Sequence, residues 1–219
     1  MKKYFKILKS CPLFADIAED EMGAMLDCLG ARVTSFGKKY TILAEGTAAR
    51  HVGIVLSGSV QVIQNDWFGN RSIVGQMGEG EVFAEAFAAG GVESLPVSVI
   101  AAEDSEILLI ECHRILHACC KVCSFHQRLI FNLMKDLAVK AVQFHQKLEI
   151  TSKRTTREKL LAFLAQQQKK SGKAKFTIPF DRQDLADFLE VDRSGLSTEI
   201  GKLQREGMLR AVKREFELL

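Results

Sequence analysis

The chain has 219 residues, of which 47% are hydrophobic and 26% are charged, and its formal net charge is +3. This composition is typical of a globular protein, and the length suits one large or two small domains. No stretch of 18 or more uncharged apolar residues occurs and no signal peptide is recognised, so a membrane protein and a secreted protein are not expected. We therefore expect a cytoplasmic protein whose six cysteines are not paired in disulfides.

Residues 3 to 30 have the apolar spacing of amphipathic helices. From residue 31 to residue 111 the pattern changes to short runs rich in Val and Ile, and glycines such as Gly37, Gly58 and Gly80 separate them. Regular short strands with turn residues between them are typical of a closed β sandwich or barrel. The first half of the chain is therefore predicted to be a helical segment followed by a β domain.

The segment from 113 to 149 contains neither Pro nor Gly, and it carries an apolar stripe at helical spacing. A helix of roughly 30 residues is much longer than the mean of about 11–12 residues. We therefore expect its stripe to pack against the same helix of a second copy, which predicts a homodimer. The alternative is that the stripe packs on the β domain of its own chain. The stripe consists of Leu129, Leu133, Leu137, Ala141, Phe144 and Leu148.

The last part of the chain is basic. Residues 150 to 219 hold fifteen Lys and Arg against ten Asp and Glu, a balance of +5, whereas the preceding residues hold fifteen against seventeen, a balance of −2. A basic part joined to a slightly acidic one indicates a polyanionic partner for the former. The polar stretch "ITSKRTTREKL" at 150 to 160 predicts a hinge followed by a new helix.

The stretch "DRQDLADFLEVDRSGLSTEIGKL", residues 181 to 203, predicts two helices separated by a short turn. Asp192 is suited to cap the second helix, because its carboxylate accepts exposed backbone N–H groups. Arg193 is the candidate for reading guanine in the major groove, and Lys202 is better suited to a phosphate. The residues predicted to contact DNA are Arg193, Ser194, Ser197, Thr198 and Lys202 on the second helix, and Arg182 and Gln183 on the first.

The ordered set of motifs resembles the bacterial cyclic-AMP receptor protein / fumarate-nitrate reductase regulator (CRP/FNR) family. The resemblance is carried by "LSGSV" at 56 to 60, "GEVFAE" at 80 to 85 and "IPFDRQDLADFLEVDRSGLSTEIGKLQREGML" at 178 to 209. It implies an α+β fold with an N-terminal β-roll (a double-stranded β-helix, like that of cyclic-nucleotide-binding domains). A long dimerisation helix at about 113–149 and a C-terminal winged helix-turn-helix follow. The implied domains are residues 1–149, which sense an effector, and residues 150–219, which bind DNA.

The resemblance also implies a homodimeric transcription regulator that binds double-stranded DNA and RNA polymerase. An enzyme is not expected, because no G-x-S-x-G, H-E-x-x-H or nucleotide-binding glycine loop occurs. Two alternatives stay open. One is a regulatory module that acts on a partner protein, and the other is a constitutive DNA-binding dimer whose β-roll has lost its ligand.

The effector predicted from the resemblance is a small molecule other than cyclic AMP. Cyclic-nucleotide-binding members of the family hold the phosphate with an Arg-Ser pair and the ribose with a Glu. Glu85 stands at the place of that Glu, but Leu95 and Pro96 stand at the place of the Arg-Ser pair, which removes a charge-assisted contact. The predicted effector-binding residues are Glu85, Ala84 and Leu95; the alternative for Glu85 is a solvated helix residue.

A cysteine-rich stretch, "ECHRILHACCKVCSFHQRLI", begins at residue 111. On a helix, Cys119, Cys123 and His126 share one face, and thiolate and imidazole groups suit zinc, iron or haem. Thiol oxidation is a second hypothesis for the same residues, which would make the protein a redox sensor. The alternative is that these cysteines are small buried hydrophobic residues.

Overall fold

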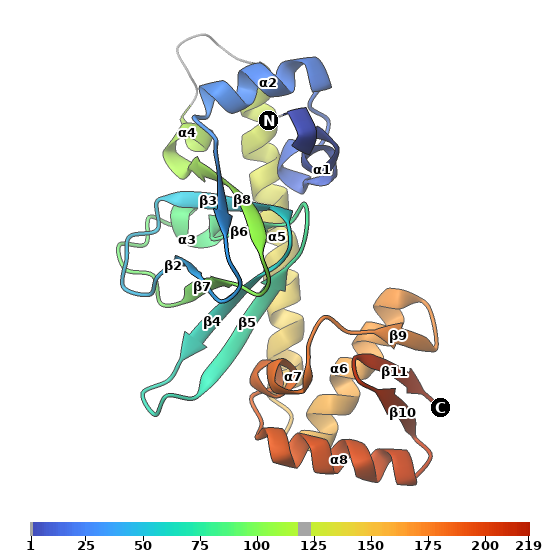
Figure 1. The fold of residues 1–219 in the computed structure, drawn as a ribbon. Helices are drawn as coiled ribbons and strands as arrows, with labels where there is room; N and C mark the ends of the chain where they lie inside the picture. The colour runs from blue at the N-terminus through green and yellow to red at the C-terminus, as the bar shows by residue number, and fades with distance from the viewer. Residues whose placement is uncertain (1, 118–123) are drawn as a thin grey trace. The chain divides into compact units, whose positions relative to one another are not determined.

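The computed structural model describes residues 2–117 and 124–219, and these residues form two compact units (Figure 1). One unit contains Met1–Gln64 and Val74–Ala141, and the other contains Asn65–Ile73 and Val142–Leu219. The domain boundary between residues 149 and 150 stays a prediction. Among the described residues, no helix is both long enough and apolar enough to cross a membrane.

The first unit is built on two four-stranded sheets, as the regular glycine-separated runs predict. The strand order is β1-β8-β3-β6 in one sheet and β2-β7-β4-β5 in the other, so strands that are distant in sequence lie side by side (Figure 1). Its strands are β1 (Arg32–Phe36), β2 (Thr41–Leu43), β3 (His51–Ser57), β4 (Val60–Asn65), β5 (Arg71–Met77), β6 (Val82–Phe83), β7 (Ser98–Ala101) and β8 (Ser105–Glu111). This arrangement is the expected β-roll.

Two glycines are needed for the strands to approach one another. Gly58, in the turn between β3 and β4, has φ +79°, and a Cβ there would lie 2.5 Å from the carbonyl oxygen of Asp104. Gly53, in the middle of β3, has an ordinary backbone, but a Cβ there would lie 2.1 Å from the ring of Phe83. The ring of Phe83 therefore takes the space that any other side chain at position 53 would fill.

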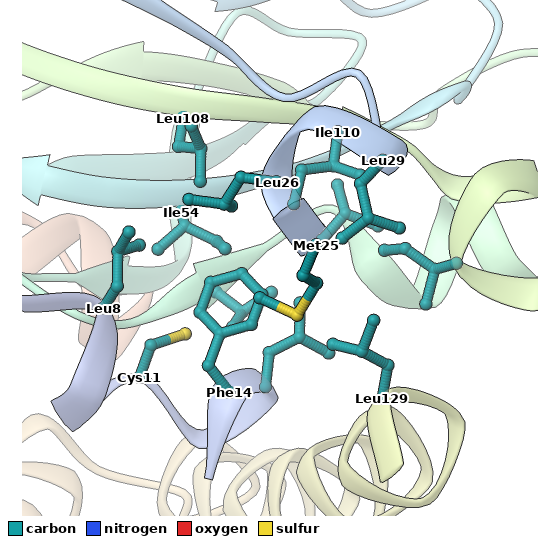
Figure 2. Packing of buried hydrophobic residues seen from close by; sticks show 14 of the residues in the cluster. Leu8, Cys11, Phe14, Met25, Leu26, Leu29, Ile54, Leu108, Ile110 and Leu129 are labelled. Carbon is teal, nitrogen blue, oxygen red and sulfur yellow. The ribbon is translucent and has the colours of Figure 1, made fainter. Parts of the chain in front are cut away.

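Short helices cover one end of the β-roll, and together they enclose its main core (Figure 2). Figure 2 shows Leu8, Phe14 and Leu26 from the N-terminal segment directed toward Ile54 and Leu108 of the strands. Side chains at these positions are fully buried, which is where burial stabilises most. The helices are η1 (Lys2–Tyr4), α1 (Phe5–Ser10), η2 (Pro12–Phe14), α2 (Glu19–Cys28), α3 (Glu85–Ala89) and α4 (Cys112–Leu116).

The long helix α5 (Ser124–Thr151) begins later than the predicted helix at about 113–149, because α4 is a separate short helix that ends at Leu116 with His117 in an extended conformation. The buried face of α5 also differs from the prediction. Leu129 and Leu133 are 0% and 2% exposed and belong to the core of the β-roll unit, and Leu137 packs against that core. The prediction that these three leucines face a second copy is therefore wrong. The alternative, packing on the β domain, is confirmed for them, because the apolar cluster of the N-terminal helices lies against this side of α5.

Polar side chains also attach α5 to its own unit. Asn132 is 4% exposed, and its amide Nδ2 donates to the carbonyl oxygens of Leu13 at 3.0 Å and Ala15 at 2.8 Å. Asp136 and Lys140 follow at intervals of four residues, so all three lie on one face of the helix. This face is polar and is flanked by the buried leucines.

The second unit holds the helical hairpin and a small antiparallel sheet with the strand order β10-β11-β9 (Figure 1). Thr155 begins α6 with a capping box, in which its hydroxyl accepts from Glu158 N–H and the Glu158 carboxylate accepts from Thr155 N–H. Rings of Phe163, Phe180 and Phe188 meet in the core, at centroid distances of 4.8 to 6.1 Å. The elements are α6 (Thr156–Ser171), β9 (Lys175–Thr177), α7 (Arg182–Leu189), α8 (Arg193–Arg205), β10 (Leu209–Val212) and β11 (Glu215–Leu218).

Candidate nucleic-acid interface and sensor site

The two helices predicted for residues 181 to 203 are α7 and α8, and their inner faces are those that the apolar spacing predicts. Leu185, Ala186 and Leu189 of α7 are fully buried. Leu196, Ile200 and Leu203 of α8 are at most 4% exposed. Because these apolar residues of α8 pack in the core, the polar residues of α8 lie on the outer face of the helix.

The turn between the helices is made by Glu190, which has φ 55° and ψ 56° and ends α7 in the left-handed conformation. This conformation costs a residue with a Cβ about 1–2 kcal/mol, and glycine avoids it at an entropic cost of about 0.5–1 kcal/mol. Lys159 of α6 contributes to the same turn, since its ammonium donates to the carbonyl oxygens of Leu189 and Glu190 at 3.2 Å.

The strained turn gives a direct prediction. Glu190→Gly is expected to be more stable than Glu190→Ala by about 0.5–1 kcal/mol, because both variants lose the carboxylate and only glycine relieves the left-handed strain. The measurement is the free energy of unfolding of the two variants in urea. Equal stabilities would show that the Cβ at this turn carries no strain.

Asp192 caps α8 as predicted, with its Oδ2 accepting from the backbone N–H of Gly195 at 2.8 Å. The hydroxyl of Ser194 donates to the same oxygen. Both contacts lower the pKa of the Asp192 carboxyl, and the hydrogen bond from the Ser194 hydroxyl has the larger effect. The cap is therefore charged at neutral pH, and its contribution to stability is lost as the pH falls through this lowered pKa.

The residues predicted to read DNA lie together on the exposed side of α8. Arg193 is in the first turn, so its guanidinium extends from the end of the helix that such motifs place in the major groove. Lys202 lies near the other end, with its Nζ 3.4 Å from Glu199 Oε2. The exposed polar residues of this face are Arg193, Ser194, Ser197, Thr198 and Lys202.

The two predicted contact residues on α7 have partners within the unit. The guanidinium of Arg182 lies over the ring of Phe216 at 4.9 Å, and burial lowers its pKa. The amide of Gln183 donates to Asp187 Oδ1 at 2.7 Å. A role of either residue in phosphate contact stays a prediction.

The orientation of α8 is set from α6 by Arg157. Its Nη1 lies 3.1 Å from Glu206 Oε1 and 3.4 Å from Glu199 Oε1. Glu199 is in α8 and Glu206 directly follows that helix, so one guanidinium holds its C-terminal half. The other oxygen of the Glu199 carboxylate, Oε2, lies 3.4 Å from Lys202 Nζ.

The sequence prediction missed a basic pair in the turn between β10 and β11, Lys213 and Arg214. Both residues are exposed, and Lys213 has φ 52°, the left-handed conformation of a tight turn. The sequence contains a signal for them, because two adjacent basic residues follow the predicted helix-turn-helix, in the part of the chain where the family resemblance implies a wing. Basic side chains on such a turn are suited to phosphate contact, which positions a protein on DNA without specifying sequence.

The residues predicted to bind an effector lie at the start of α3 and in the following loop, and all three are buried. Ala84 and Leu95 are 7% and 1% exposed, so Leu95 places an apolar side chain in a packed interior where the family resemblance implies a guanidinium. Ala84 has φ 62°, a left-handed conformation for a residue with a Cβ. Glu85 is 3% exposed and pairs with Lys140 of α5, so it is not the solvated helix residue of the alternative. An effector-binding role for the three residues stays a prediction.

Of the predicted metal or redox residues, Cys119 and Cys123 lie outside the described residues. His126 is 3% exposed, its Nε2 donates to the carbonyl oxygen of Arg114 at 3.3 Å, and it lines a cavity of about 280 Å³ with Cys28 and His117. Within residues 2–117 and 124–219, no group of three or more His, Cys, Asp or Glu is disposed to hold a metal ion. The metal and redox hypotheses stay predictions.

Comparison with known families gives two matches, one in each half of the chain. The cyclic nucleotide-binding domain family matches residues 33–119, and the Crp-like helix-turn-helix domain family matches residues 158–219. A search of curated proteins gives no match. The second family match decides against the alternative of a module that acts only on a protein partner.

Several solved structures share the fold over nearly the whole chain. FixK2 from Bradyrhizobium japonicum is 20% identical, with a TM-score of 0.68 over 86% of this chain and 92% of that one. The c-di-GMP responsive global regulator CLP from Xanthomonas campestris is 18% identical, with a TM-score of 0.73 over 90% and 98%. A CooA mutant from Carboxydothermus hydrogenoformans is 18% identical, with a TM-score of 0.63 over 90% and 85%.

The two family matches occur in the order that the fold requires, and together they cover more than half of the chain. The β-roll, the long helix and the winged helix-turn-helix are the parts of a DNA-binding regulator with a cyclic-nucleotide-binding-like sensor domain. This chain therefore belongs to the CRP/FNR family of transcription regulators.

Proposed function

We propose that the protein is a homodimeric transcription regulator that reads its operator mainly through Arg193 and changes its DNA affinity when the β-roll binds a small molecule other than cyclic AMP. The observation that carries the first part is the placement of Arg193 in the first turn of α8, exposed and next to the Asp192 cap. A guanidinium there can make a bidentate contact with guanine. Ser194, Ser197 and Thr198 are the additional base-reading candidates, and Lys202 is assigned to phosphate.

Arg193→Ala is expected to lower the affinity for a specific site by about 1–3 kcal/mol while leaving affinity for random DNA nearly unchanged. The site is first obtained by selecting bound sequences from random duplexes. Fluorescence anisotropy at one fixed salt concentration then gives both affinities for each variant. Operator binding equal to that of the wild type would remove Arg193 from the base-reading role.

Two matched variants separate charge from base reading. Arg193→Lys keeps the charge but loses the bidentate geometry, so it is expected to lose specificity like Arg193→Ala. Arg205→Ala removes the same charge from the exposed C-terminal end of α8 and is expected to affect specific and random DNA alike.

The homodimer is supported by an exposed apolar seam on α5. Large apolar residues are exposed there, with Phe131 at 55%, Met134 at 60% and Leu148 at 57%. The exposed positions follow the alternating three- and four-residue spacing of a coiled coil. We define the seam as Phe131, Met134, Ala138, Ala141, His145 and Leu148. Ala141 and Leu148 belong to the stripe first predicted from the sequence, and Phe144, which is 60% exposed, flanks the seam.

Two further parts of the proposal come from the family. RNA polymerase is the expected protein partner once two recognition helices occupy half-sites about 34 Å apart. A ligand-controlled β-roll is supported by the family match over residues 33–119, and the relative CLP is described as responsive to c-di-GMP. For this chain the effector is expected to differ from cyclic AMP, because Leu95 offers no charge for a phosphate.

A further inference from the structure

A buried charged cluster joins α3 to α5 inside the β-roll unit. The ammonium of Lys140 lies 2.7 Å from Glu85 Oε1 and 3.2 Å from Asp136 Oδ2. It also donates to the carbonyl oxygen of Val82 at 2.6 Å. An ammonium has three N–H donors. Lys140 donates to Glu85 Oε1 and to the Val82 carbonyl oxygen, whereas Asp136 Oδ2 is close enough for an ion pair but is buried without a hydrogen-bond partner.

The carboxylates of this cluster outnumber the ammonium two to one. The side chains of Glu85 and Asp136 are 4% and 8% exposed, and the second carboxylate oxygen of Glu85, Oε2, is buried without a hydrogen-bond partner. The nearby thiols of Cys11 and Cys112 add no further negative charge, since burial raises the pKa of Cys11 to about 12 and also raises that of Cys112. One negative charge is therefore left over, and a buried charge without a partner is costly.

Lys140 is the outermost member of the cluster. Its side chain is 24% exposed, several times more than either carboxylate, so it lies between them and solvent. It is held at the end of a flexible four-carbon stem, and it can leave without unfolding α5. A molecule that approaches from solvent therefore meets Lys140 before it meets Glu85.

We propose that Glu85 and Asp136 form the receptor of the effector, that the effector is a small organic cation with an ammonium or guanidinium group, and that Lys140 occupies the receptor in its absence. This inference rests on the proposed function, because it names the ligand class of the β-roll. Two carboxylates repel a phosphodiester and attract a cation. An organic cation fits better than a metal ion, because the described residues contain no group of three or more metal-ligating side chains.

Displacement of Lys140 would have a structural effect on the long helix. Lys140 is in α5, whereas Val82 begins the β-roll strand β6 and Glu85 begins α3. A cation that replaces the ammonium at Glu85 therefore releases α5 from both contacts. The effector then acts on the same helix that carries the proposed dimer seam, which links its binding to the spacing of two recognition helices.

Isothermal titration calorimetry of the full chain with agmatine and putrescine tests the ligand class. Lys140→Met is expected to bind agmatine at least about 10-fold more tightly than the wild type, because the competing intrachain ligand is gone. Adding Glu85→Gln to Lys140→Met is expected to weaken that binding at least about 10-fold, because a charge-assisted contact is lost. If Lys140 and Glu85 formed only a structural ion pair, the two substitutions would not change agmatine binding in opposite directions.

Controls keep the outcome decisive. Lys38→Met removes an exposed lysine of the same unit and is expected to leave agmatine binding at the wild-type value. If Lys140→Met does not fold, as judged by circular dichroism, Lys140→Gln retains a hydrogen-bond donor and is used in its place. Absence of agmatine and putrescine binding in the folded variant would overturn the proposal, as would binding that does not depend on Glu85 or tighter binding of cyclic AMP. The DNA affinity of the Arg193 variants is measured without ligand. A failure of the proposed cation site is therefore distinguishable from a failure of the proposed DNA reading.

Discussion

Ala141→Glu is expected to convert the protein to a monomer and to lower its affinity for a duplex with two half-sites by about 10²–10⁴-fold. Ala141 lies in the middle of the seam on α5, where a second copy would bring another Ala141 close to it. Two carboxylates at that place would be desolvated and would repel each other. Binding to both half-sites would then no longer be joined in one molecule. Sedimentation velocity and anisotropy measure the two effects.

The matched control for this change is Gln143→Glu. Gln143 is exposed on α5 only two residues away, but it lies on the side of the helix opposite to the seam. The same charge there is expected to leave both the oligomeric state and the DNA affinity unchanged. A dimeric Ala141→Glu variant would place the contact between copies elsewhere on the chain.

Leu133→Ala is expected to lower the free energy of unfolding by about 2–5 kcal/mol, because Leu133 is buried in the core of the β-roll unit and truncation leaves a cavity. Phe131, two residues earlier, is 55% exposed on the seam. In a monomeric Ala141→Glu background, Phe131→Ala is expected to change stability by no more than about 0.5 kcal/mol. Urea unfolding of the two variants compares the faces.

The comparison of Leu133 with Phe131 has a clear contrary outcome. If Phe131→Ala were the more destabilising change in the monomer, the face of α5 that packs on the β-roll would be the one that carries Phe131. A normal dimer affinity in Phe131→Ala, with the unsubstituted Ala141, would also argue against the seam.

The helix-turn-helix was predictable because its signals are local. Leu185, Leu189 and Leu196 have the spacing of inner helical positions, and Asp192 stands directly before the second helix, so a short stretch of sequence contains the whole pattern. The β-roll was predictable as a class, because the glycines that separate its strands are frequent and regular. Its strand order was not predictable from the residues alone, since β1 pairs with β8 across a long sequence separation.

The sequence could not show which face of α5 packs on the β-roll. Apolar residues occur on more than one side of this helix, at Leu129 and Leu133 as well as at Phe131 and Met134. Periodicity shows that faces exist but not which of them meets the core. The pair of Glu85 with Lys140 was likewise hidden, because the two residues are 55 positions apart in the chain.

The polar face of α5 has a consequence for how this helix can move. A slide of one turn, about 5.4 Å, toward the residues now near Asn132 would bring Asp136 against the carbonyl oxygens of Leu13 and Ala15. Carboxylates and carbonyls only accept hydrogen bonds, so that new register is repulsive, whereas an all-leucine face would tolerate it. The polar face of α5 therefore opposes an axial slide in this direction, whereas it does not oppose a rotation or a local detachment of the helix.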